Sequence, residues 1–539
     1  MKPAALFLLA ACGSSADAPS PVVEPAPTIV EPAPRPEPGV DLAGPIAGTE
    51  SAPMPRKPAV PFDLAADRAV VKVSVPVPPR GGSVAFTFAD ERPGWVARIP
   101  EAQQLPSVAY GHDRVFVSGG FNSVSFYALD ATTGRIEWAT TNLEDNGPTA
   151  AIVDGEDVLF NTESCTLFSL NAKTGKRNWL RYLGDPTLSQ IALVDGLVYS
   201  SYPDPEAGGQ MLGAFRSKTG APVWSRSVGA ELLATPVISG DSVYVSTIAG
   251  MTYRFEHRTG RTRWAKPLRA TTAPWIVGDE LFVTRRSGAK EQQIVVAVDT
   301  GKIVREHRVS AGSYAYDVPS SLESWETVWA FEGSRPVVDR GIHYVAMGNE
   351  VIASDAKTGE SIWHRRYNTK ADARSLGSVA LAGSTIVVSS RDGKVFGLDV
   401  DTGFTLWSYD IGRKIVAEPI IARGWLYSTT TDGFVIALNV ADKSLDGWHM
   451  FGGNAAKNGA TIAPPTPKPL EGNTTQLDDV SPDALVAKAQ PTFETRFKAD
   501  VEADALDAAL ARKAAEVRAR RSHPVELDPS CLTDVFCRK

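Results

Sequence analysis

Short runs of β-branched and aromatic residues recur along most of the chain, and each run is bounded by Gly, Asp or Ser. Runs of this kind, closed off by turn-forming residues, are typical of β-strands. A polar turn follows each run, and a further strand pattern lies on either side of that turn. We therefore expect about four strands in each repeated unit. The eight runs read RVFV, DVLF, GLVYS, SVYVS, ELFVT, IHYVA, TIVVS and WLYST.

The polar turns share a Thr-Gly pair, and the Gly recurs every 40 to 45 residues apart from one spacing of 58. In most copies a Trp stands four residues after the Gly. The fifth copy has Arg305 there, and a degenerate eighth copy has Lys443 in place of Gly and its Trp one position late. The pairs are Thr133-Gly134, Thr174-Gly175, Thr219-Gly220, Thr259-Gly260, Thr300-Gly301, Thr358-Gly359 and Thr402-Gly403.

Eight repeats of four strands predict an all-β fold, an eight-bladed β-propeller of four-stranded antiparallel blades over residues 81–460. The Thr-Gly pair closes a hairpin, where Gly supplies positive φ without strain. We expect the Trp of each outer strand to lie between adjacent blades, and Gly94–Pro100 to complete the eighth blade and close the ring. The predicted blade-docking residues are Trp95, Trp138, Trp179, Trp224, Trp264, Trp363, Trp407 and Trp448.

The repeated pattern LDxxTGxxxW resembles that of the PQQ-like repeat family, named after quinoprotein dehydrogenases that bind pyrroloquinoline quinone. The ending GWHMFGGNAAKNG, Gly447–Gly459, is similar to a closing element of the same family. Within that family, the chain looks most like the lipoproteins made of one eight-bladed propeller that belong to the machinery folding outer-membrane β-barrels. The resemblance implies a protein-binding scaffold without chemistry.

Both ends of the chain differ in composition from the repeats. Residues 1–11 predict a signal peptide, and Leu9–Cys12 (LAAC) resembles a bacterial lipobox, which implies that Cys12 becomes the lipid-bearing N-terminus. Thirteen prolines between Pro19 and Pro61 predict an extended tether over residues 12–80. The C-terminal tail, residues 461–539, predicts a linker and then a helix over residues 493–521. It ends with Cys531 and Cys537, whose pairing in a disulfide stays open.

Candidate chemistry is sparse. The four Cys, at positions 12, 165, 531 and 537, are never adjacent, so the vicinal pair that quinoprotein dehydrogenases place beside their quinone is missing. The seven His form no metal or haem motif, and neither a Walker A loop nor a GxSxG elbow is present. We therefore predict no catalytic residue, no cofactor and no metal site. A net charge of −7 without a basic stripe argues against nucleic acid as a partner.

The 58-residue spacing implies an insertion, Ser313–Pro336, that is rich in aromatic residues. Such a loop on a rigid scaffold is a candidate interaction site, and packing of the same side chains on the propeller is the alternative. We expect a monomer anchored at the outer membrane, on its periplasmic side or at the cell surface, that binds envelope proteins such as barrel-assembly components. A quinone-dependent dehydrogenase and a ligand-sensing or adhesion module are the alternatives. The aromatic residues are Tyr314, Tyr316, Trp325, Trp329 and Phe331.

Overall fold

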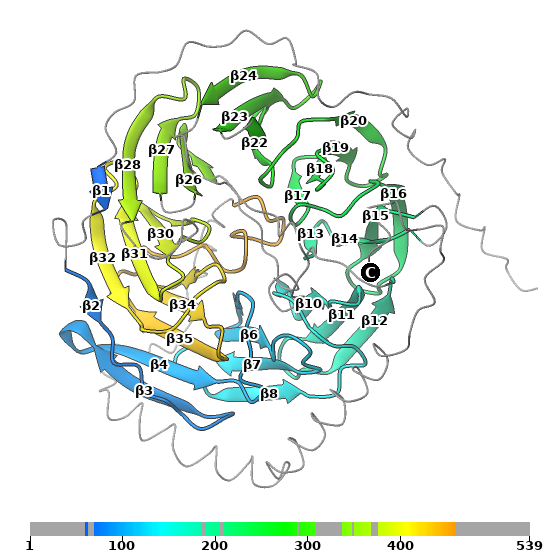
Figure 1. Ribbon diagram of the computed structural model, residues 1–539. Helices are drawn as coiled ribbons and strands as arrows, with labels where there is room; N and C mark the ends of the chain where they lie inside the picture. The colour runs from blue at the N-terminus through cyan, green and yellow to red at the C-terminus, as the bar shows by residue number, and fades with distance from the viewer. Residues whose placement is uncertain are drawn as a thin grey trace, which may run out of the picture. The chain divides into compact units, whose positions relative to one another are not determined.

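The computed structural model describes residues 60–62, 69–184, 190–204, 208–287, 290–308, 337–347, 350–367 and 376–459. These residues form eight separate β-sheets that follow one another as the blades of a propeller (Figure 1). The predicted all-β, eight-bladed fold with antiparallel blades is thereby confirmed. The described residues include no helix long and apolar enough to cross a membrane. The predicted signal peptide, C-terminal helix and terminal Cys pair lie outside them.

Blades are numbered here in chain order, and the strands of each are given from the axis outward. Blades 1 to 4 consist of β5 (Ala109–Gly111), β6 (Arg114–Ser118), β7 (Phe126–Asp130) and β8 (Ile136–Thr140); β9 (Ile152–Asp154), β10 (Asp157–Asn161), β11 (Thr166–Asn171) and β12 (Arg177–Tyr182); β13 (Ala192–Val194), β14 (Leu197–Pro203), β15 (Gln210–Arg216) and β16 (Pro222–Ser227); and β17 (Val237–Ser239), β18 (Ser242–Ser246), β19 (Thr252–Glu256) and β20 (Thr262–Lys266). Blades 5 to 8 consist of β21 (Trp275–Val277), β22 (Glu280–Ser287), β23 (Lys290–Ala297) and β24 (Ile303–Arg308); β25 (Val337–Asp339), β26 (Ile342–Met347), β27 (Glu350–Asp355) and β28 (Ser361–Tyr367); β29 (Ala380–Ala382), β30 (Thr385–Ser389), β31 (Lys394–Asp399) and β32 (Thr405–Asp410); and β33 (Ile420–Ala422), β34 (Trp425–Thr429), β35 (Phe434–Asn439) and β4 (Arg92–Arg98).

The second strand of each blade is the apolar run that reveals the repeat in the sequence. In β18 and β30 all five residues are buried, because each sheet is covered on both faces by its neighbours. A strand buried on both faces is continuously apolar instead of alternating. The outer strands are more open, and β12 contains no fully buried residue. The propeller core is thus a series of contacts between sheets, formed largely by the inner three strands.

An early strand of the chain completes the last blade. β4 pairs with β35, and Trp95 lies opposite Ala437. The predicted role of Gly94–Pro100 in closing the ring is confirmed by this pairing. An additional strand, β3 (Ser83–Phe88), pairs with the outer side of β4 and is joined to it by a single 3-10 turn, η1 (Ala89–Glu91). Blade 8 therefore has five strands and draws on both ends of the repeat region.

The expected tether does not extend to residue 80. β1 (Val60–Phe62) pairs in parallel with β28 of blade 6, and β2 (Val71–Lys72) pairs in parallel with β32 of blade 7 (Figure 1). This corrects the prediction that residues 12–80 are free of the propeller. The prolines mislead here because a strand at a sheet edge needs few of its own N–H groups, so Pro61 is tolerated within β1.

Candidate functional site

The Thr-Gly turns and the tryptophans, which look like separate features of one repeat, meet between neighbouring blades. In six junctions the Trp indole Nε1 donates a hydrogen bond of 2.7–3.0 Å to a backbone carbonyl of the next blade. That carbonyl belongs to the residue three positions before the turn Gly. The donor and acceptor residues are Trp95 and Ala131, Trp138 and Ala172, Trp179 and Ser217, Trp224 and His257, Trp264 and Val298, and Trp363 and Val400.

The turn Gly provides the space that each indole occupies. Gly134 has a φ of +68°, and a methyl group placed on it would lie 2.3 Å from a ring carbon of Trp95. The other five of these junctions show the same approach, at 2.5–2.8 Å. Gly is therefore required twice, for the left-handed backbone conformation and for the neighbouring ring. Since Trp95 belongs to blade 8 and Gly134 to blade 1, this contact also closes the ring.

Two outer strands lack the hydrogen bond from a Trp indole to the next blade, and the sequence indicates one of them. Arg305 replaces Trp in blade 5 and donates to the Ala356 carbonyl at 3.3 Å, the same position in the next blade. Arg305 also donates to both carboxylate oxygens of Glu280, at 2.5 and 2.7 Å, and these bonds lower the pKa of Glu280. In blade 7, Trp407 lies across Gly397 of its own blade. Blade 8 has no Thr-Gly turn to receive it.

Trp448 was expected to dock between blades, and the structure places it elsewhere. It is fully buried next to the inner strand of blade 8, where it forms an isolated bridge with Ile421. Its Nε1 donates to the Glu418 carboxylate at 3.1 Å, and the Gly452 N–H donates to the same oxygen at 2.7 Å. The one-residue displacement of Trp448 in the sequence thus marks the end of the blade pattern.

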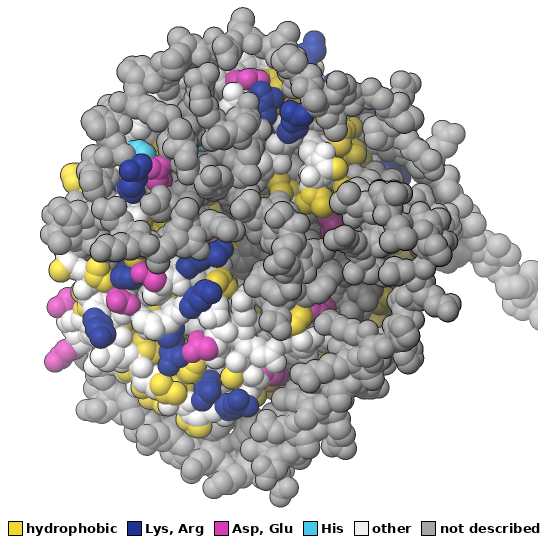
Figure 2. Space-filling model, viewed as in Figure 1, with side chains coloured by type: hydrophobic (Ala, Val, Ile, Leu, Met, Phe, Trp, Pro, Cys, Tyr) yellow, Lys and Arg dark blue, Asp and Glu magenta, His cyan; other side chains and the backbone are white. Residues whose placement is uncertain are grey.

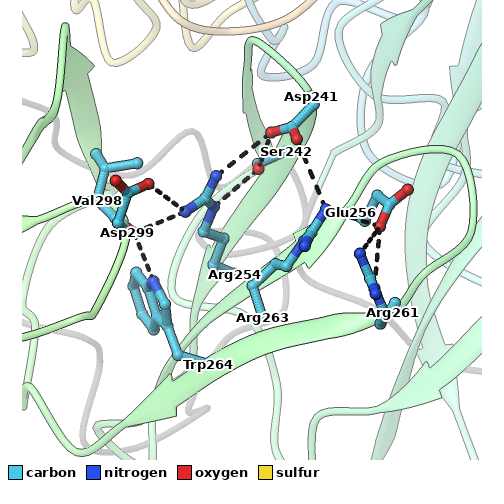
Figure 3. Close-up of polar contacts among 9 residues, drawn as sticks. All are labelled: Asp241, Ser242, Arg254, Glu256, Arg261, Arg263, Trp264, Val298 and Asp299. Carbon is cyan, nitrogen blue, oxygen red and sulfur yellow. Dashed lines mark hydrogen bonds and ion pairs between the residues drawn. The ribbon is translucent and has the colours of Figure 1, made fainter.

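The junction between blades 4 and 5 adds charge to the Trp contact (Figure 3). Arg254 and Trp264 of blade 4 both donate to the Val298 carbonyl, at 2.9 and 2.7 Å. Arg254 also pairs with Asp241 of its own blade and with Asp299 of blade 5. A hydrogen bond from Ser242 is the main cause that lowers the pKa of Asp241. The charged groups at this site are engaged in holding two blades together.

The segment 447–459 runs along the inner strands of several blades. Its backbone carbonyls accept hydrogen bonds of 2.7–3.0 Å from N–H groups of β33, β5, β13 and β17. In Figure 1 this orange segment lies in the middle of the propeller. The described residues contain no group of three or more His, Cys, Asp or Glu that could hold a metal.

A buried carboxyl group lies between blades 8 and 1. Glu101 is in the linker after β4, and its carboxylate accepts hydrogen bonds of 3.0 Å from Ser123 and Tyr127 of blade 1. Burial raises the pKa of Glu101 despite these bonds. Glu101 has a structural role, because its hydrogen bonds join the linker to blade 1. No sequence motif marked this residue.

The predicted interaction loop, with Tyr314, Tyr316, Trp325, Trp329 and Phe331, lies outside the described residues, as do Cys12, Cys531 and Cys537. Cys165 is buried, and its thiol donates to the Ser201 carbonyl at 4.0 Å. On the described part of the face in Figure 2, basic, acidic and apolar side chains are interspersed. Apart from the blade contacts, the sequence-predicted site residues are not brought together by the described structure.

Comparisons with known proteins match one family model and proteins of more than one kind. The family model described as outer membrane protein assembly factor BamB matches residues 80–307 and 368–474. BamB of Yersinia pestis is 23% identical over 288 residues, which cover 51% of this chain and 69% of that protein. The structure of BamB from Moraxella catarrhalis matches with a TM-score of 0.48 and 19% identity, covering 66% of this chain and 98% of that one. Tetrathionate hydrolase of Acidithiobacillus ferrooxidans is 21% identical over 407 residues, which cover 69% of this chain and 78% of that protein.

Proposed function

Because the chain belongs to the family of the outer membrane protein assembly factor BamB, we propose that it is a non-enzymatic scaffold that binds envelope proteins during assembly of outer-membrane β-barrels. The family match is the observation that carries this proposal. The structure supports it, because the repeated Trp and Gly residues are used in joining the blades. A rigid propeller then leaves its loops and outer edges for binding partners.

The proposed location is the periplasmic side of the outer membrane, with Cys12 as the lipid-bearing residue. A lipobox-like segment, Leu9–Cys12, supports this anchor. Replacement of Cys12 by Ser is expected to move the protein from the membrane fraction to the soluble periplasmic fraction. Retention of the Cys12→Ser variant in membranes after a salt wash would contradict the anchor while leaving the scaffold role untouched.

The partner is tested by affinity purification from crosslinked envelopes, in which we expect components of the barrel-assembly machinery to copurify. We propose the aromatic loop as part of that interface. Combined Ala replacement of Trp325 and Trp329 is expected to reduce recovery of the partner without lowering the melting temperature. Phe404→Ala is the matched control, because Phe404 is an aromatic residue of blade 7 with 54% exposure. Unchanged recovery with the double variant would remove the loop from the interface.

An enzymatic role is the second candidate, and the similarity to tetrathionate hydrolase favours it. One feature of this chain opposes the quinone version of that role, namely the lack of adjacent Cys residues. Titration of the purified protein with pyrroloquinoline quinone and calcium distinguishes the two. A saturable spectral change together with dye reduction would reject the non-enzymatic proposal.

A further inference from the structure

Blades 7 and 8 lie next to each other, with β32 and β4 as outer strands (Figure 1). Their junction lacks the contact between a Trp and a Thr-Gly turn, and two arginines pack there on one aromatic ring. The guanidinium carbon of Arg98, the last residue of β4, lies 5.4 Å from the centre of the Phe434 ring. That of Arg413, in the linker from β32 to β33, lies 3.8 Å from the same centre. One buried ring thus holds two positive charges close together.

Only one of these arginines has an acidic partner among the residues that the structure describes. Arg413 forms an ion pair with Asp432, in the turn before β35. The guanidinium of Arg98 forms no ion pair or hydrogen bond within the described segments, and its Nε is buried without a partner. Arg98 is therefore fixed by packing on Phe434, while its two terminal nitrogens still have N–H groups to donate to another molecule.

Blade 6 shows what can balance an arginine at this position. Arg366 stands three residues after the docking Trp of blade 6, as Arg98 does in blade 8, and it lies opposite Glu350 in the strand pairing. Arg366 forms an ion pair with Glu350. In blade 8, the residue opposite Arg98 is Phe434. The opposite strand of blade 8 therefore supplies a ring for the arginine and no balancing anion.

The position of Arg413 in the repeat is acidic in two other linkers. In the linker after β32, the Ile411 N–H donates back to its own blade at 2.9 Å, and Arg413 follows two residues later. In the linker after β4, the Ile99 N–H makes the equivalent bond, also at 2.9 Å, and the residue two positions later is Glu101. The linker after β8 has Asp145 at this place. At the junction of blades 7 and 8, a basic residue therefore takes the place of an acid.

The surrounding segments leave an excess of positive charge. The turn 390–394 packs against the backbone of Arg413, and the turn 430–434 donates to the Lys414 carbonyl at 3.0 Å. Together with Arg98 and the linker 410–414, these turns contain five basic and three acidic residues, a net charge of +2. The basic residues are Arg98, Arg391, Lys394, Arg413 and Lys414, and the acidic residues are Asp392, Asp410 and Asp432.

A phosphate monoester suits this cluster better than a carboxylate does. It carries about −1.5 to −2 charges at pH 7 and has three acceptor oxygens. It therefore matches the cluster in charge, and it can accept hydrogen bonds from two guanidinium groups at once. A carboxylate has a single charge and two oxygens, so it would leave part of the positive charge unbalanced.

We propose that Arg98 and Arg413 bind a phosphate group at the junction of blades 7 and 8, either free phosphate or the phosphate monoester of a lipid headgroup. This binding is separate from the scaffold role and does not require it. Phe434 already orders both guanidinium groups, so binding loses little side-chain entropy. A bound phosphate also joins two blades, because Arg98 belongs to blade 8 and Arg413 to the linker that follows blade 7.

Phosphate binding is measured by calorimetric titration of the full-length protein at constant ionic strength. We expect saturable binding with a dissociation constant of about 1 mM or lower, since two charge-assisted contacts are made. Arg98→Gln removes one of these contacts and is expected to weaken binding about tenfold. Arg216→Gln is the matched control, because Arg216 is an exposed arginine at the end of β15 in blade 3. It is expected to bind phosphate like the wild type.

A second readout uses the wild-type protein, so it does not depend on how a variant folds. Phenylglyoxal reacts with accessible guanidinium groups, and mass spectrometry of the digested protein gives the rate at each arginine. The bound ligand is expected to slow the reaction at Arg98 and Arg413 and to leave the rate at Arg216 unchanged. Sodium chloride at the same ionic strength is the control and is expected to protect none of them.

Vesicles distinguish the two sources of phosphate. The full-length Cys12→Ser variant, which lacks the proposed lipid anchor, is sedimented with phosphatidylcholine vesicles that contain either phosphatidic acid, a phosphate monoester, or phosphatidylglycerol, a diester. Binding that prefers phosphatidic acid and is lost in an added Arg98→Gln replacement assigns the site to a lipid headgroup. Binding of inorganic phosphate without that preference assigns it to free phosphate.

Three results would each overturn the proposal. The first is a lack of saturable phosphate binding together with no preference for phosphatidic acid. The second is equal weakening of binding by Arg98→Gln and Arg216→Gln, which would show a general effect of charge. The third is an unchanged reaction rate of Arg98 with phenylglyoxal in the presence of the ligand that binds.

Discussion

The contact between Trp95 and Gly134 predicts that a single methyl group will loosen the closure of the ring. Gly134→Ala imposes positive φ on a residue with a Cβ, at a cost of about 1–2 kcal/mol. The same methyl group would lie 2.3 Å from the indole of Trp95, and overpacking of this kind costs about 1–3 kcal/mol more. We therefore expect the free energy of unfolding to fall by roughly 2–5 kcal/mol.

A control glycine separates the two causes. Gly240 has a φ of +56°, but a Cβ there would meet no atom within 4 Å. Gly240→Ala is thus expected to lose only the conformational part, about 1–2 kcal/mol. Urea unfolding followed by Trp fluorescence measures both variants. In a Trp95→Ala background, which itself loses about 3–5 kcal/mol, Gly134→Ala should fall to the cost of the Gly240 control.

Equal losses for Gly134→Ala and Gly240→Ala in the wild-type background would refute the reasoning, because the indole would then make no contribution. An undiminished loss for Gly134→Ala after removal of Trp95 would refute it independently. The double-mutant comparison is suitable here since the two residues are in direct contact and belong to different blades.

Three further predictions concern Glu101, the ion pair of Arg305 with Glu280, and Trp448. Burial raises the pKa of Glu101, so its contribution to stability is present below pH 4.5 and is lost as the pH rises. The difference in melting temperature between Glu101→Gln and the wild type should therefore change in favour of Glu101→Gln as the pH is raised from 4.5 to 7. A difference that stays constant with pH would contradict this. The pKa of Glu280 is lowered, so the pH dependence of its contribution to stability has the opposite sign. The stability advantage of the wild type over Arg305→Met should be complete at pH 7 and should shrink as the pH falls below about 4.5. Thermal melts at each pH measure this difference. Trp448→Ala should lower the free energy of unfolding by about 3–5 kcal/mol, and should speed proteolysis within the segment 447–459; an unchanged cleavage rate would show that the buried ring does not hold that segment.

The blade count and ring closure were predictable because they depend on a period that one chain displays eight times. Only one of the two reasons for the turn Gly could be predicted from the sequence. Its positive φ follows from local turn chemistry, but the indole that lies against Gly134 belongs to Trp95, on the neighbouring blade. Reading within a single repeat cannot show a contact between repeats. Arg305 illustrates the same point, since it breaks the pattern yet binds the equivalent carbonyl of the next blade.

The remaining differences have physical causes of their own. Proline content predicted a free tether up to residue 80, but strand addition at an edge uses few N–H groups and admits Pro61. Trp448 resembled a displaced docking residue, although the outer strand of blade 8 is supplied by β4. Glu101 has no motif, because its environment is made by a linker and a distant strand. Such groups become visible only when the blades are assembled.

The pairing of β4 with β35 has a consequence for how the protein is made. A chain that is synthesised from its N-terminus delivers Trp95 early and its opposite residue, Ala437, near the end of the repeat region. Contacts between such distant residues form late and slowly, because the intervening chain must first be ordered. Until β35 arrives, β3 and β4 form a hairpin that has no blade to pair with. The newly synthesised protein therefore passes through an open arc whose two end blades are not yet joined. Chaperone binding, misassembly or exchange of β4 between two chains can occur at this stage.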